Sequence, residues 1–119
     1  MDFFGSFGNT NEETKAKLMP VADQILAAHQ DGDYREFKSV ITADLSGKVD
    51  EDSFVTAHRQ IGLELGDLLC KDLLGFFRRD GNPLLLFSAK YSKTEDDVLI
   101  HIAFENGSSP PKIDWIWIE

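Results

Sequence analysis

The sequence predicts an α+β domain with three helices in its first half and a four-stranded antiparallel meander in its second half. Apolar residues recur every three or four positions up to Gly66, as in amphipathic helices, and about every second position after it, as in strands. The predicted helices all precede the strands, whereas a parallel sheet needs the two kinds of element to alternate. Because short turns join the strands, we expect neighbours in the chain to pair antiparallel.

A long first helix is predicted from about residue 11. Thr10 and Glu13 have the spacing of a capping box, in which two side chains satisfy free amides at a helix start. Apolar residues at helical spacing follow as far as Ala28, so one face of this helix is apolar. Pro20 lies within this stretch and should bend the helix, unless the helix begins there with Pro20 in its first turn.

Two further helices are predicted before Gly66. Asp33 can cap a short second helix, and residues 50–53 (DEDS) place negative charge and capping side chains where the positive end of a third helix would be. Gly66 fits the end of that third helix. The polar residues 44–50 include a Ser-Gly pair and are expected to form a loop.

Four strands are predicted after Gly66. Residues 79–83 have the composition of a tight turn, and residues 106–112 form a Gly, Ser and Pro loop. In the third strand, alternation places His101 on the face opposite Ile100 and Ile102. The predicted strands cover residues 68–77, 84–92, 98–104 and 113–118.

Length and charge limit the classes of function. A chain of 119 residues rarely holds two independent cores, so a single domain is expected over residues 10–119. The net charge of −9 argues against a nucleic-acid partner and against docking on an anionic membrane, because both need positive charge on the protein. A single cysteine leaves no internal disulfide framework.

Residues 1–9 are expected to form a short N-terminal arm. They contain Phe3, Phe4 and Phe7, which we expect to pack on the body of the domain or on a neighbour. They lack the basic start and the unbroken apolar stretch of a secretory signal. No run in the sequence reaches the roughly 18 apolar residues of a membrane span, so a cytoplasmic location is expected.

Three segments resemble the nuclear transport factor 2-like, or cystatin-like, cone fold. They are residues 28–34 (AHQDGDY), similar to the short interval after the first helix of many members, residues 54–66, and the closing residues 112–118 (KIDWIWI). The resemblance spans about residues 10–119 and implies three N-terminal helices packed on a curved four-stranded antiparallel meander. Members include dehydratases, ketosteroid isomerases, SnoaL-like polyketide cyclases and many domains with no known chemistry. The resemblance implies no particular reaction, because one scaffold can host many sites.

Three residues are candidates for acid–base chemistry. His58 lies on the helix stripe expected to face the sheet, so it could be a general base in a pocket or an ordinary packed histidine. Tyr34 could donate a hydrogen bond to a ligand or pack in the core. Asp72 interrupts an apolar strand and could project into the cone or face solvent. In the enzyme relatives acids inside the cone transfer the proton, but neither Asp72 nor Asp114 lies in a motif that aligns with theirs.

A ligand pocket is expected between the helices and the sheet. Phe37, Phe54, His58 and Trp115 are the expected lining, because such pockets are mostly apolar with few polar groups. His29 is expected near the end of the first helix, where its charged form would favour the negative end of the helix dipole. No histidine pair has the spacing of a zinc site, so neither a metal nor another cofactor is expected.

Three functions remain open. The first is a non-enzymatic dimeric domain that binds a small apolar or amphipathic molecule in the cone. The second is an isomerase, dehydratase or cyclase, which needs two titratable groups near one point of a cavity. The third is a structural or protein-partner module, favoured if the domain has no cavity of roughly 300 Å³ or more. Because the last strand is apolar on both faces, its outer face is expected to form a homodimer contact.

Overall fold

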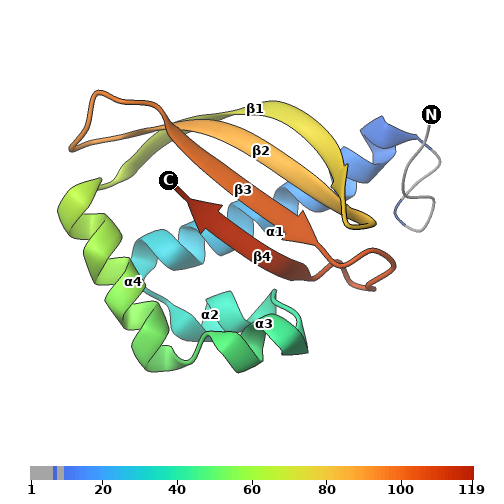
Figure 1. Ribbon diagram of the computed structural model, residues 1–119, viewed down its shortest axis with the longest axis horizontal. Helices are drawn as coiled ribbons and strands as arrows, with labels where there is room; N and C mark the ends of the chain where they lie inside the picture. Colours follow the sequence, from blue (N-terminus) through green and yellow to red (C-terminus); the bar gives the residue numbers. More distant parts are fainter. Residues whose placement is uncertain (1–6, 8–9) are drawn as a thin grey trace.

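Four helices precede four strands in the computed structural model, which describes residue 7 and residues 10–119. This order confirms the predicted α+β class (Figure 1). The elements are α1 (Asn11–Asp31), α2 (Tyr34–Ser39), α3 (Ala43–Lys48), α4 (Glu51–Glu64), β1 (Leu68–Arg79), β2 (Asn82–Tyr91), β3 (Val98–Phe104) and β4 (Ile113–Ile118).

The strands form one antiparallel sheet in the order β1-β2-β3-β4, so the predicted meander is confirmed. Asp80 and Gly81 both have positive φ, 54° and 82°, between the paired residues Arg79 and Asn82. Two such residues form the type I′ turn that matches the twist of a hairpin. The pairing of β1 with β2 shifts register at two places, and bulges of this kind bend a strand. The sheet is accordingly curved, with β1 and β2 arching over the helices (Figure 1).

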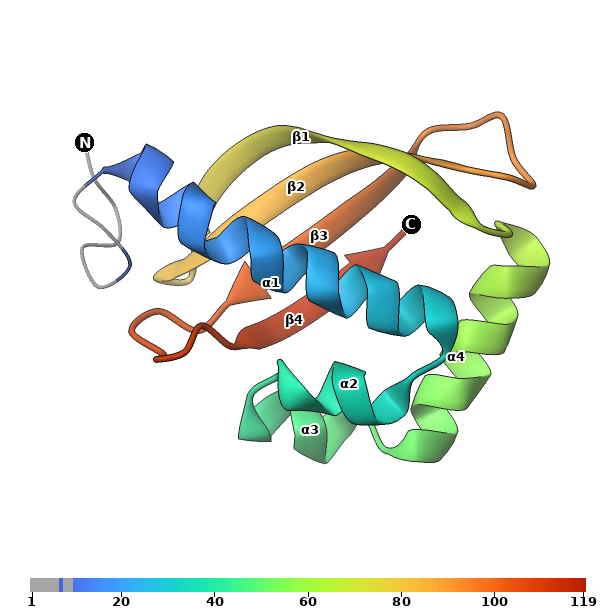
Figure 2. The same ribbon diagram turned by 180° about the vertical axis from the view of Figure 1, so that it is seen from behind.

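The long helix α1 crosses one face of the sheet, while α4 stands at one end of it (Figure 2). The Thr10 hydroxyl accepts a hydrogen bond from the Glu13 amide at 3.1 Å, as the capping box predicts. Because α1 begins at Asn11 and continues through Pro20, the alternative start at Pro20 is wrong. At its end Gly32 takes the left-handed conformation, with φ of 70°.

A fourth helix, α3, occupies residues that were expected to form a loop. The Thr42 hydroxyl accepts from the Leu45 amide at 3.1 Å and caps this six-residue helix. Leu45 is its one buried residue. One buried apolar residue cannot show a helical period, and the Ser46-Gly47 pair is typical of a turn. The sequence pattern therefore did not predict this helix.

The core lies between α1 and the inner face of the sheet. Phe7 is buried there too, so this residue of the predicted arm packs on the body of the domain, whereas Phe3 and Phe4 fall outside the described residues. In β3 buried and half-buried residues alternate, which confirms the predicted outward face of His101. The fully buried apolar side chains include Leu18, Ile25, Leu85, Phe87, Ile100, Ile102 and Phe104.

The last strand is also tied to the helical half. Ile41 forms a parallel bridge with Ile113, whose amide donates to the Val40 carbonyl at 2.8 Å. The Thr42 amide donates in turn to the Ile113 carbonyl at 2.9 Å, and the Thr42 hydroxyl donates to the Asp114 carboxylate at 2.8 Å. The start of β4 is therefore hydrogen-bonded on both of its edges. Across the described part of the chain, no helix has both the length and the apolar character needed to cross a membrane.

Candidate functional site

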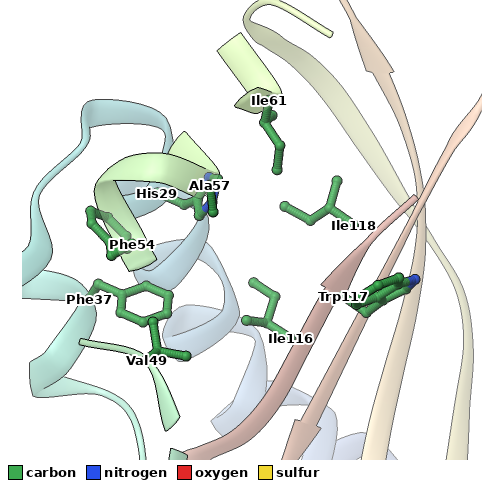
Figure 3. A pocket seen from close by; sticks show the side chains of 9 residues that line it. All are labelled: His29, Phe37, Val49, Phe54, Ala57, Ile61, Ile116, Trp117 and Ile118. Atoms are coloured by element: carbon green, nitrogen blue, oxygen red, sulfur yellow. The ribbon is translucent and has the colours of Figure 1, made fainter. Parts of the chain in front are cut away.

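A hollow of about 230 Å³ lies between α4, the end of α1 and β4. Figure 3 shows Ile116 and Ile118 pointing from β4 into this hollow, with Ile61 of α4 on the opposite wall. Eight of its nine lining residues are apolar, so the hollow suits an apolar occupant. The lining residues are His29, Phe37, Val49, Phe54, Ala57, Ile61, Ile116, Trp117 and Ile118.

Phe54 is the buried residue that fixes the beginning of α4 beside the hollow. Within α4, whose residues are all described, only Phe54 is buried, with 1% of its surface exposed. Its ring lies 4.8 Å from that of Phe37 and 5.7 Å from the imidazole of His29. Leu63, in the last turn of α4, is 68% exposed and does not line the hollow. The space left between α4 and β4 is the hollow.

His29 supplies the one titratable side chain of the lining. Burial, and to a lesser extent the charge of His58, lowers the pKa of His29 from 6.5 to about 4. The imidazole is therefore neutral at pH 7, so the charged role expected for it at the helix end is wrong. The sequence did carry a signal for this position: His29 follows Ile25 by four residues and continues the buried stripe of α1.

We expect His29 to make the protein less stable as the pH falls from 7 to 5, by about 2 kcal/mol. Its folded-state pKa lies below its unfolded value of 6.5, so the unfolded chain binds the proton first. The contribution to stability is fully present above pH 6.5 and is lost progressively as the pH falls toward 4. Urea unfolding of the wild type and of His29→Gln at pH 7, 6 and 5 measures this effect. Parallel pH profiles for the two proteins would contradict it.

His58 lies beside the hollow and does not line it. Its Nδ1 donates a hydrogen bond to the His29 carbonyl oxygen at 2.7 Å. Its ring packs over Gly32, where a Cβ atom would come within 2.9 Å of His58 Nε2. The side chain therefore ties α4 to the end of α1, which is the role of a packed histidine.

The other two acid–base candidates lie elsewhere. The Tyr34 hydroxyl donates to the Val49 carbonyl at 3.3 Å, and its ring lies 5.5 Å from that of Phe54. Asp72 is exposed and pairs with Ser88 across the outer face of the sheet. The structure therefore does not bring His58, Tyr34 and Asp72 together at one point of the hollow.

Of the four expected lining residues, Phe37 and Phe54 lie in the wall of the hollow, whereas Trp115 lies on the opposite face of the sheet. Trp115 pairs with Ala103, is 47% exposed and stacks on Trp117 with ring centroids 6.3 Å apart. The alternation in β4 separates tryptophans from isoleucines without showing which set faces the helices. In the structure the isoleucines face the helices, because branched aliphatic side chains fill the inner face and the larger amphipathic tryptophan rings remain outside.

No metal site can be assembled from the residues that the structure describes, since no three His, Cys, Asp or Glu side chains come together there. Cys70 is a free cysteine and is exposed on β1. No protein-family model, curated protein or solved structure matches this chain significantly. What the chain does must therefore be inferred from the hollow and from the outer face of the sheet.

Proposed function

We propose that this chain is a non-enzymatic domain of the nuclear transport factor 2-like superfamily that binds a small apolar or amphipathic molecule between α4 and β4. The observation that carries the proposal is the apolar hollow of about 230 Å³. The helices packed on a curved antiparallel meander support the kinship. The isomerase, dehydratase or cyclase alternative has less support, because its three acid–base candidates lie apart.

The volume of the hollow limits the size of the ligand. It is below the roughly 300 Å³ at which pockets for drug-sized ligands begin, and for ligands of that size the criterion given above favours the structural or protein-partner alternative. It is larger than an apolar cavity of about 150 Å³, which is enough to admit benzene. A molecule of one or two rings is the size that fits.

Titration with toluene, followed by amide chemical shifts, tests this function. We expect shifts to concentrate on residues that line the hollow. Ala57 is an exposed residue of this lining, so Ala57→Trp should fill the mouth of the hollow and abolish the response. Ala27→Trp is the matched control, because Ala27 is exposed on α1 and does not line the hollow. No shift at the lining in the wild type would refute the proposal.

We further propose that two copies pair through the outer face of the sheet. Phe77, Trp115 and Trp117 are 45–51% exposed on this face, from β1 and β4. Monomeric proteins rarely expose apolar patches of this kind unless a partner covers them. Tryptophans are also enriched among the residues that dominate binding energy at protein interfaces.

We expect sedimentation equilibrium at micromolar concentration to give twice the 13.4 kDa mass of one chain. Trp115→Lys should yield the monomer, because it places a charge in the middle of the contact. Leu63→Lys is the control, since Leu63 is a still more exposed apolar residue, at 68%, but lies on α4. A wild-type monomer at these concentrations would show that the outer face serves another purpose.

A further inference from the structure

We infer that His29 is the hydrogen-bonding anchor of the hollow, and that the ligand is an uncharged molecule of one or two rings bearing a single hydroxyl or carbonyl group. This inference rests on the proposed function and specifies its ligand class. It follows from the position of one imidazole in an otherwise apolar lining.

The His29 ring has hydrogen-bonding capacity that the protein does not use. Within residues 10–119, no hydrogen bond to its ring nitrogens is found, whereas its backbone carbonyl accepts from His58 Nδ1. No buried side-chain nitrogen in this part of the chain lacks a partner, so the ring nitrogens of His29 must reach open space. His29 lines the hollow and a neighbouring depression of about 20 Å³, and only the hollow has room for more than water.

Trp117 carries the other hydrogen-bonding group among the lining side chains, and that group is already occupied. Trp117 donates its indole N–H to the Glu119 carboxylate at 3.1 Å. Figure 3 places Trp117 on the far side of β4 from Ile116 and Ile118, at the rim of the hollow. A polar group on a bound molecule therefore has His29 as its side-chain partner.

The lining also disfavours ligands that carry a charge. None of the nine lining residues is Asp, Glu, Lys or Arg, and the lowered pKa of His29 keeps its ring neutral at pH 7. A carboxylate or an ammonium group would be desolvated there without a counter-charge, which is strongly unfavourable. A neutral imidazole has one N–H donor and one acceptor, so it can pair with a hydroxyl or with a carbonyl.

Four probes of one size and different polarity test the inference at pH 7: toluene, phenol, benzoate and benzylamine. We expect toluene and phenol to shift the amides of the lining, and the two charged probes to bind at least about tenfold more weakly. In His29→Phe the phenol-to-toluene ratio of Kd values should rise by about three- to tenfold, the usual net effect of one neutral hydrogen bond. His29→Gln keeps a donor and an acceptor and should restore part of the phenol preference.

His101→Phe is the matched control, because His101 lies on the outer face and should leave the Kd ratio unchanged. Amide spectra of each variant verify that it is folded before its affinities are compared. An unchanged ratio in both His29 variants, with toluene still bound, would overturn the anchor and leave the proposed function standing. Benzoate binding as tight as that of phenol would overturn the uncharged class. Absence of any response to all four probes would instead refute the proposed function itself.

Discussion

Phe54→Ala is expected to lower the free energy of unfolding by about 3–5 kcal/mol, the usual cost of deleting a buried aromatic side chain. Phe54 is 1% exposed and is the only buried residue of α4. Its ring packs on His29, Tyr34 and Phe37, so the substitution removes the main anchor of the helix. Urea unfolding measures the loss.

Leu63→Ala is the matched control on the same helix. Leu63 is 68% exposed, so its truncation should change stability by less than about 0.5 kcal/mol. Hydrogen exchange adds a local measurement, because loss of the anchor should release the amides of α4 before those of the sheet. A loss of stability in Phe54→Ala no larger than that in Leu63→Ala would mean that α4 is held by contacts other than this ring.

Gly66→Ala is expected to cost about 2–3 kcal/mol, because it combines backbone strain with a steric conflict. Gly66 has φ of 80°, a conformation that costs an L side chain about 1–2 kcal/mol. An added Cβ would lie 2.2 Å from Ser92 Oγ and 3.2 Å from the Lys93 amide nitrogen. Ser92 Oγ accepts a hydrogen bond from the Asp67 amide at 2.8 Å, so moving it aside forfeits about 1 kcal/mol more.

Gly107→Ala separates the two causes. Gly107 has a similar φ of 84°, but an added Cβ would meet nothing within 4 Å, so only the strain of about 1–2 kcal/mol should appear. In a Ser92→Ala background the conflicting oxygen is absent, and the cost of Gly66→Ala should fall toward that of Gly107→Ala. Thermal unfolding of the single and double variants checks both statements. Equal losses in Gly66→Ala and Gly107→Ala would show that the corner relaxes without conflict.

The features of this fold that could be predicted from sequence are the periodic and locally capped ones. Thr10, Asp33 and Asp50 accept from amides three residues on, as capping residues do, and the strands of the second half follow alternating patterns. The short helix α3 could not be predicted, because Leu45 is its single buried residue. Elements that depend on one contact distant in the chain leave no local period to detect.

The site was predictable only in part for a related reason. Phe37 and Phe54 were expected in the wall because helix spacing directs them inward, and the structure places them there. Which face of β4 meets the helices is decided by the packing of the whole domain, so Trp115 could not be assigned from its own strand. The neutrality of His29 likewise depends on burial by residues far along the chain.

The bridge between residues 40–42 and the start of β4 has a consequence for how the protein is made. It joins residues about 70 positions apart, and one of its hydroxyls also caps α3. During synthesis residues 40–42 therefore emerge about 70 residues before their partners in this bridge. The hydrogen bonds that residues 40–42 make with Ile113 and Asp114 can therefore form only after most of the sheet has been translated. Deletion of β4 is accordingly expected to remove hydrogen-bond partners from residues 40–42 as well as from β3.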